Sequence, residues 1–387
     1  MPRRIVVVGG GPVGLAAAIS AADRGFEVTL IEKDQVGHSL RSWGATRFFS
    51  PLAMNVSRLM LEILGRDAPA GEALLTGEEM RSGVLEPLAA RAPLAGRIRA
   101  GTRVVAIGRR GLTRSDYAGH PLRAERPFRL AIENGSGEET IEADVVLDAT
   151  GGYVLPNAIG SGGLPARGER TLLDRAIRTL GELERRKEDL RGRRVLLIGN
   201  GHSAANAVGA LAELAVEDDS MRVVWAVRTL HRRPCEEVAG DPLPERQRVV
   251  AAANALAEDP PPFLQVERRA MVESFAERDG ALHVTLSGGR EVVCDRVAAF
   301  TGFRPGNGIH SELTVEISPV TEGAARLHRA VANVTDCLSV PRLSPRDLDS
   351  GEANYWLVGS RSYGRARTFL LHTGLAQMET ILESIRP

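Results

Sequence analysis

The sequence of 387 residues contains only three cysteines, and none of them lies close to another. Cys235, Cys294 and Cys337 are widely separated, and no C-x-x-C motif occurs. This pattern predicts neither a dithiol redox pair nor a zinc site, and we expect no metal ligands. Because scattered free thiols are typical of reducing compartments, we expect the protein to be in the cytoplasm.

An excess of one charge and a long hydrophobic run are also missing. Lys plus Arg and Asp plus Glu both number 49, so the formal net charge is zero, which argues against a dedicated nucleic-acid binder. There is no run of about 18 apolar residues, so we expect no membrane span. The apolar stretch at 5–8 is too short for a signal peptide and ends in glycines. The length predicts two domains.

The chain begins with a strand–turn–helix–strand pattern. The β-branched run Arg4–Val8 is typical of a central parallel strand that is buried on both faces. An Ala-rich helix is expected over Pro12–Asp23, and Gly25 ends it. The segment Glu27–Glu32 then predicts the second strand of a βαβ unit.

The turn in this unit, GGGPVG over 9–14, matches the G-x-G-x-x-G pattern of dinucleotide-binding folds. In that pattern Gly9 allows the tight turn, Gly11 lets a pyrophosphate approach the backbone, and Gly14 lets the helix pack on the strand. Glu32 ends the second strand, where a carboxylate can accept hydrogen bonds from the ribose hydroxyls. The alternative is a glycine turn in an α/β protein that binds no nucleotide. We predict an FAD site formed by these four residues together with Pro12, Val13 and Lys33.

The same pattern recurs near the middle of the chain. Strand Arg194–Ile198 leads into GNGHSA over 199–204, a G-x-G-x-x-A variant, and a helix is expected over Ser203–Leu214. The next strand, Met221–Arg228, ends in a cation where the first unit has an acid. A guanidinium there can pair with a 2′-phosphate, which favours NADPH over NADH, whereas the alternative is a solvated strand-end charge. The predicted NADPH residues of this unit are Gly199, Gly201, His202, Ser203, Ala204 and Arg228.

Two further motifs lie where strands are expected to end: DATG over 148–151 and FTGFRP over 300–305. Together with the two glycine motifs, they resemble the two-dinucleotide-binding-domain flavoproteins, the group that contains thioredoxin-reductase-like enzymes and class B flavin monooxygenases. The resemblance covers nearly the whole chain. It implies an α/β fold of two Rossmann-like three-layer domains, with the NADPH domain inserted into the FAD domain.

The resemblance also implies domain boundaries. We expect the first part of the FAD domain over 1–190, with substrate-side loops at 36–100. The NADPH domain follows at 191–296, and 297–387 completes the FAD domain. Within the NADPH domain, Asp241–Pro262 is expected to be a surface loop that leads into a short helix. We expect a small-molecule substrate and leave a homodimer open.

Further cofactor contacts are implied only by the resemblance. Thr150 and Gly151 lie near the flavin or the hinge, and Val104 is expected to meet the adenine. Gly359-Ser360 falls where such proteins often have Gly-Asp at the flavin ribityl or phosphate, so Ser360 offers a hydrogen bond but no charge. On the NADPH side, the implied residues are Thr301 and Gly302.

Candidate substrate-side residues come from two loops. Trp43 is expected to shield the flavin ring from water, although the aromatic residues in this loop could also be core. Near the C-terminus, arginines lie between a strand end and a helix start, where they would bind an acidic group or form a salt-bridged loop. The substrate-side candidates are Arg47, Asn55, Arg361, Tyr363 and Arg365.

The reaction is less constrained than the fold. Without C-x-x-C, disulfide reduction by the usual route is not expected, and the F-x-G-x-x-x-H signature of class B monooxygenases is absent from Arg186–Gly192. We expect an NADPH-dependent monooxygenase that oxygenates a small molecule through a flavin C4a-(hydro)peroxide, with no catalytic acid or base identified. The alternatives are a flavoprotein reductase or dehydrogenase and a non-enzymatic flavin redox sensor.

Overall fold

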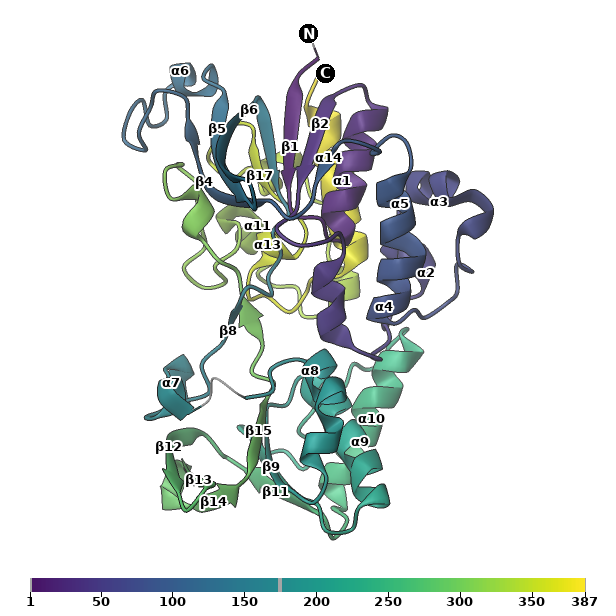
Figure 1. Ribbon diagram of the computed structural model, residues 1–387, viewed down its shortest axis with the longest axis vertical. Coiled ribbons are helices and arrows are strands. Elements are labelled where there is room, and N and C mark those ends of the chain that lie inside the picture. Colours follow the sequence, from purple (N-terminus) through teal and green to yellow (C-terminus); the bar gives the residue numbers. More distant parts are fainter. Residues whose placement is uncertain (1, 173–175, 387) are drawn as a thin grey trace. The chain divides into compact units, whose positions relative to one another are not determined.

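The computed structural model describes residues 2–172 and 176–386, and the chain forms two compact units (Figure 1). The first unit comprises Met1–Leu40, Pro51–Leu155 and Phe303–Pro387, and the second comprises Arg41–Ser50 and Pro156–Gly302. These boundaries differ from the expected ones at 190/191 and 296/297.

The earlier boundary has a physical cause, because the chain before residue 190 already packs on the second unit. Ile177 donates a backbone hydrogen bond to Val297, and Leu183 and Leu190 are buried in the core of that unit. The charged stretch that precedes the second glycine motif is therefore part of the second unit.

The first unit is built on a parallel five-stranded sheet. Its strand order is β17 (Tyr355–Leu357), β7 (Val145–Asp148), β1 (Arg4–Val8), β2 (Glu27–Ile31) and β3 (Ile98–Arg99). The central strand β1 pairs with β2 on one side and with β7 on the other. The carboxyl ends of β1, β2 and β7 therefore meet at one edge of the sheet, where the first glycine turn lies.

Helices and a second, antiparallel sheet complete the layers of this unit. Helix α1 (Pro12–Asp23) packs against the sheet and against α14 (Leu371–Ser384), and the antiparallel strands lie toward the other side of the sheet (Figure 1). Every residue of α1 from Val13 to Ala21 is buried, which explains its apolar composition on all sides. The antiparallel strands are β4 (Arg103–Arg109), β5 (Phe128–Asn134) and β6 (Gly137–Ala143).

The segment between β2 and β3 is largely helical. Its helices are α2 (Leu52–Asn55), α3 (Arg58–Leu64), α4 (Gly77–Met80) and α5 (Glu86–Ala90), with one π-helical turn at Arg81–Leu85. The region expected as loops over 36–100 thus contains ordered helices, and α1 contacts α3. The remaining short elements are α6 (Pro121–Ala124), β8 (Leu155–Pro156), α7 (Glu169–Leu172), α8 (Leu180–Arg185), β16 (Phe303–Arg304), α11 (Ala325–Ala330), α12 (Pro345–Leu348) and α13 (Ser360–Tyr363).

The second unit repeats this architecture on a smaller scale. Its parallel sheet has the order β11 (Leu264–Arg268), β10 (Arg222–Val227), β9 (Arg194–Ile198) and β15 (Arg296–Ala299). Together with the first unit, it confirms the predicted α/β class with two Rossmann-like domains. The covering elements are α9 (His202–Glu217), α10 (Pro244–Glu258) and the antiparallel strands β12 (Val272–Arg278), β13 (Ala281–Leu286) and β14 (Glu291–Cys294).

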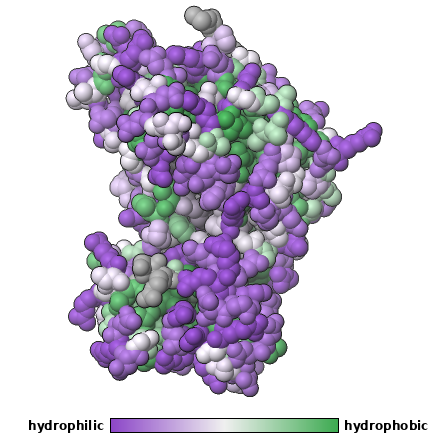
Figure 2. Space-filling view, in the orientation of Figure 1, coloured by the Kyte–Doolittle hydropathy of each residue, from purple (hydrophilic) through white to green (hydrophobic). Residues whose placement is uncertain are grey.

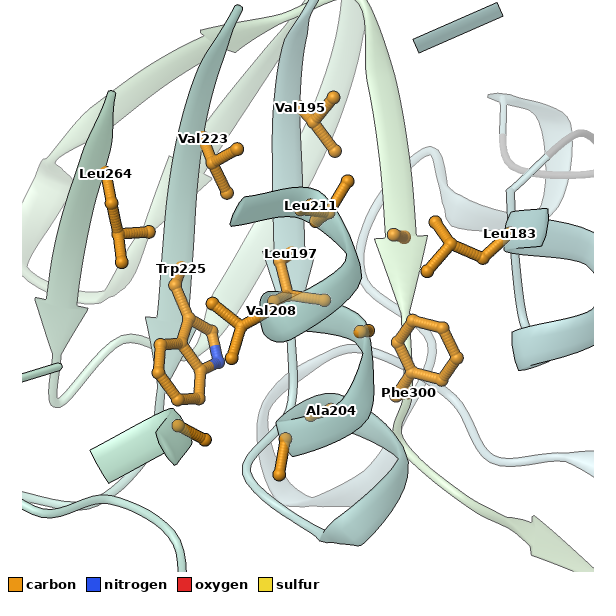
Figure 3. Packing of buried hydrophobic residues seen from close by; sticks show 14 of the residues in the cluster. Leu183, Val195, Leu197, Ala204, Val208, Leu211, Val223, Trp225, Leu264 and Phe300 are labelled. Carbon is orange, nitrogen blue, oxygen red and sulfur yellow. The ribbon is translucent and has the colours of Figure 1, made fainter. Parts of the chain in front are cut away.

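Both faces of the second parallel sheet are buried. Successive side chains of β9 alternate between two clusters: Leu197 packs with Trp225 and helix α9, whereas Leu196 and Ile198 pack toward the antiparallel strands (Figure 3). A strand that is buried on both faces needs apolar residues at every position. The unbroken apolar run of β9 follows from this requirement.

Matching ion pairs close the other end of each sheet. The Asp144 carboxylate accepts hydrogen bonds from the backbone N–H of Arg4 and from its guanidinium, both at 2.9 Å. Asp295 accepts the same two bonds from Arg194, at 2.8 and 2.6 Å. The hydrogen bonds from the arginines hold the pKa of both aspartates below the ordinary value.

The surface is mainly hydrophilic on the face drawn in Figure 2, with hydrophobic side chains scattered between hydrophilic ones. In the part of the chain that the structure describes, no helix has the length and apolarity needed to cross a membrane.

A buried charged group joins the antiparallel strands to the C-terminal segment. The Glu352 carboxylate is 2% exposed and pairs with Arg109 at 2.8 Å and with Arg123 at 3.0 Å, and both arginines are buried as well. Thr314 donates to the same carboxylate through its backbone and its hydroxyl. The guanidinium of Arg109 also lies 3.7 Å from the ring centroid of Phe128.

We expect Glu352→Gln to lower the free energy of unfolding by roughly 3–5 kcal/mol, because it leaves two buried guanidinium groups without a counter-charge. Chemical denaturation of the purified variant measures the change. A loss below about 1 kcal/mol would show that Glu352 and its two arginines stabilise the fold no more than an exposed ion pair does.

Candidate nucleotide-binding sites

The first glycine turn is shaped by two close backbone approaches. Gly9 has a φ of +109°, and a Cβ there would collide with the carbonyl group of Ala149 at the end of β7. A Cβ at Gly14 would collide with the carbonyl oxygen of Gly9. Both glycines are therefore required by the packing of the protein itself.

Gly11 has a different role. Its φ of −76° suits any residue, and a Cβ at this position would meet no protein atom within 4 Å. The protein does not need a glycine here for its own packing, but a ligand on the backbone would. The free N–H groups at the start of α1 face this region, and they are suited to a pyrophosphate. The turn thus fits the pyrophosphate of FAD.

Glu32 lies at the carboxyl end of β2, as the sequence predicts, and its carboxylate also binds the backbone of the glycine turn. Its Oε2 accepts a hydrogen bond of 2.6 Å from the backbone N–H of Gly10, and its Oε1 accepts one of 2.9 Å from Asp34. A carboxylate has about four acceptor positions, so capacity remains for a ribose hydroxyl. The contact with Gly10 was not predicted, because a sequence does not show which backbone donor a side chain will reach.

The second glycine turn repeats the first with one change. Gly199 has a φ of +123°, and a Cβ there would collide with the carbonyl group of Phe300, whereas a Cβ at Gly201 would meet nothing within 4 Å. Trp225 on β10 donates a hydrogen bond of 2.7 Å from Nε1 to the carbonyl of Gly199, which holds the turn against that strand. Ala204 replaces the third glycine, and its Cβ would lie 3.6 Å from a Cβ on Gly199. Helix α9 therefore leaves room for a methyl group.

The end of β10 presents an exposed cation. Arg228 is exposed and has no ion pair among the described residues. In contrast, Arg233 pairs with Glu237 at 2.6 Å and with Glu258 at 3.8 Å. The guanidinium of Arg268 donates to the carbonyls of two loop residues and of Ala257 in α10. The charge at Arg228 is thus available to an anion at the strand end.

The segment Arg41–Ser50 contributes to the second unit. Its Phe49 ring meets the imidazole of His202 edge-on at 5.2 Å, and Trp43 stacks on Phe48 at 4.5 Å. The backbone N–H of Ala45 donates to Glu184 at 2.7 Å. The sequence predicts Trp43 and Arg47 in the FAD domain, whereas the structure places both in the unit that contains α9.

Several predicted FAD residues come together at the C-terminal part of the first unit. Ser360 Oγ accepts a hydrogen bond of 3.1 Å from the backbone of Gly152, next to Gly151. Gly359 has a φ of +62°, and a Cβ there would lie 3.1 Å from Val13. Thr150 donates its hydroxyl hydrogen to Asp148 at 2.6 Å. The structure thus gathers Val13, Thr150, Gly151, Gly359 and Ser360 around the end of β7.

Comparison with known proteins agrees with this geometry. The family model described as pyridine nucleotide-disulphide oxidoreductase matches residues 3–324. The chain belongs to this family. This membership confirms the resemblance to flavoproteins with two dinucleotide-binding domains that is seen in the sequence.

Solved structures of this fold include enzymes with different reactions. A bacillithiol disulfide reductase from Staphylococcus aureus superposes with a TM-score of 0.69 at 17% identity, covering 99% of this chain and 98% of that one. An ornithine N-hydroxylase from Kutzneria sp. 744 gives 0.63 at 15% identity, covering 99% of each chain. These likenesses show the fold alone.

Curated relatives match only in part. A 95-residue stretch, 24% of this chain, is 40% identical to an NADH oxidase from Thermoanaerobacter brockii. The chain spans only 6% and 13% of the lengths of the first curated relatives it matches.

The cysteines of this family member are all buried. Burial raises the pKa of the Cys235 and Cys294 thiols to about 12, so neither is a thiolate near neutral pH. Both lie in the second unit, whereas Cys337 follows the first-unit helix α11. Among the residues described, no group of three His, Cys, Asp or Glu side chains could hold a metal.

The remaining predicted site residues differ in their exposure to solvent. Arg361 and Tyr363, which the sequence predicts on the substrate side, are 0% and 2% exposed. Asn55 is 3% exposed, and Arg365 is exposed and pairs with Glu322 at 3.5 Å. Among the other predicted cofactor residues, Lys33, Gly302 and Ser203 are exposed, Pro12 is partly exposed and Val104 is buried. The hydroxyl of Thr301 donates a hydrogen bond to the carbonyl of Asn157.

We expect Gly11→Ala to fold normally and to lose its bound flavin. The methyl group enters only the space assigned to the pyrophosphate, so the free energy of unfolding should change by less than about 1 kcal/mol. The absorbance of the purified protein should show flavin content falling from a full complement to near zero.

Gly14→Ala is the matched control on the same helix. Its methyl group collides with Gly9, so the folded state should lose about 2 kcal/mol or more. A yellow, fully loaded Gly11→Ala protein would rule out the assignment of this turn to the flavin.

Proposed function

We propose that the protein is an NADPH-dependent FAD monooxygenase that acts on a small molecule. The observation that carries the proposal is the state of the thiols. A disulfide reductase that uses its own cysteines needs an accessible thiol beside the flavin, and all three cysteines of this chain are buried. Oxygen is then the acceptor that requires no thiol of the protein.

The chain offers a definite set of residues for the two cofactors. The backbone at Gly11 and the carboxylate of Glu32 would hold the pyrophosphate and ribose of FAD, and Gly359-Ser360 would meet its ribityl side. Bound there, FAD would supply the electron transfer from NADPH to oxygen. On the second unit, Arg228 would bind the 2′-phosphate of NADPH. An N-hydroxylating enzyme shares this fold, and by analogy we infer a nitrogen-bearing substrate.

A reductase or dehydrogenase that passes electrons onward is the second candidate. It is favoured by the similarity to a disulfide reductase and, over a short stretch, to an NADH oxidase. Both candidates share the reduction of FAD by NADPH, so they differ only in the reaction of the reduced flavin.

Mixing the anaerobically NADPH-reduced protein with oxygen distinguishes the two candidates. We expect a spectral transient that differs from both reduced and oxidised flavin and lasts longer while NADP⁺ is bound. A stopped-flow spectrometer records it. Single-step return to oxidised flavin would favour the reductase. Stable reduced flavin with negligible turnover on any acceptor would favour a redox sensor.

We expect Arg228→Ala to weaken NADPH binding by about 10- to 100-fold and to leave NADH binding unchanged, because a charged hydrogen bond contributes roughly 1.5–3 kcal/mol. The KM values for the two nucleotides give the comparison. Arg233→Ala is the matched control, since Glu237 and Glu258 already neutralise that guanidinium. Equal losses for NADPH and NADH in Arg228→Ala would mean that this residue does not read the 2′-phosphate.

A further inference from the structure

A second buried charged cluster lies directly behind the residues assigned to FAD. It consists of Asp148, His310, Tyr355 and Arg361, all at most 4% exposed. None of these side chains has surface for a ligand. The cluster comes from four separate parts of the first unit, namely the end of β7, the turn at 308–310, strand β17 and helix α13.

Asp148 connects the cluster to the flavin side. Its Oδ1 accepts two hydrogen bonds from Thr150, from the backbone at 3.1 Å and from the hydroxyl at 2.6 Å. Its Oδ2 accepts bonds from the Tyr355 hydroxyl at 2.9 Å and from Arg361 Nε at 3.3 Å. One carboxylate therefore fixes the backbone that leads to Gly151 and, through Arg361, the first turn of α13.

Arg361 holds the second flavin-side segment. It follows Ser360 directly, and Ser360 accepts the hydrogen bond from Gly152 that joins the two segments. The Nη2 of Arg361 donates to Asn307 at 2.7 Å and lies 2.8 Å from Nε2 of His310. A shift of Arg361 would thus move Ser360 and loosen Asp148.

The protonation state of His310 follows from the chemistry of its partner. A guanidinium has donors and no acceptor, so Nε2 of His310 must be the acceptor and carries no proton. Burial, followed by the charge of Arg361, lowers the pKa of His310, and Asp148 opposes them. The ring of Tyr355 lies 6.0 Å from the imidazole, and Arg114 is a more distant cation that also disfavours a charged His310.

We propose that His310, through Arg361 and Asp148, is a positioning residue of the FAD site and that tight FAD binding requires its neutral imidazole. The inference rests on the proposed FAD site and adds a proton-sensitive support behind it. A proton on Nε2 would place a second cation 2.8 Å from Nη2 of Arg361 and would remove the acceptor. Arg361 would then release Ser360 and Asp148 together.

The direction of the pH effect follows from this arrangement. The folded pKa of His310 lies below its ordinary value of 6.5, so the imidazole is neutral at neutral pH and takes up a proton only on acidification. FAD binding should therefore weaken as the pH falls through the folded pKa of His310, which lies below the pKa of an ordinary imidazole. By linkage, bound FAD should lower the pKa of His310 further.

The experiment compares FAD affinity at about pH 7.5 and about pH 5.5 in the wild type, His310→Gln and His283→Gln, using the fluorescence of free flavin. Gln keeps an acceptor but does not titrate. We expect the wild-type Kd to rise, by less than about tenfold because the pKa of His310 lies below that of an ordinary imidazole, and the Kd of His310→Gln to stay flat. His283, which pairs with Glu291 in the second unit, is the matched control and should behave as the wild type.

Two outcomes would overturn the proposal: a wild-type Kd that is independent of pH, or a His310→Gln Kd that rises as in the wild type. If His310→Gln does not fold, the imidazole of His310 in the wild type can be titrated by NMR with and without FAD, and an unchanged pKa would also overturn it. A protein that binds no FAD at any pH would instead refute the proposed function.

Discussion

The close approach of a glycine turn to the last carbonyl of a neighbouring strand is the constraint on which both units depend. Gly9 lies against Ala149, and Gly199 lies against Phe300. A side chain at either glycine would push the turn off the sheet and move the start of the following helix with it. These backbone contacts therefore fix the position of the helix N-terminus and its free N–H groups. They also fix the open space next to the third residue of the turn.

The two units share this constraint but differ at one strand end. Both close the far end of the sheet with an Arg–Asp pair, and both leave open space at the middle glycine of the turn. They differ at the end of the second strand, where Glu32 bonds to its own turn and Arg228 stays unpaired. The shared frame thus carries an acid at this position in one unit and a cation in the other, which is the difference behind the proposed ribose and 2′-phosphate contacts.

Local pattern was sufficient to predict the elements that carry the motifs. Strand Arg4–Val8 and helix Pro12–Asp23 end where the sequence indicates, because a β-branched run and a Gly-Pro start are short-range signals. Helix α10 was expected to be short, but it has 15 residues. Its buried Asn254 bonds the backbone of Cys235, which lies 19 residues earlier. Such long-range contacts leave no local pattern, and the burial of Arg361 escaped prediction for the same reason.

The segment Arg41–Ser50 also affects how the protein can be recombined. Because this segment packs with the second unit, the chain passes between the units at 40/41, 50/51, 155/156 and 302/303. The second unit is therefore not one contiguous insertion. A chimera that imports residues 156–302 from another family member would place a foreign surface against the native Phe49, whose partner is His202. Exchange of cofactor preference by grafting thus requires both pieces to be transferred together.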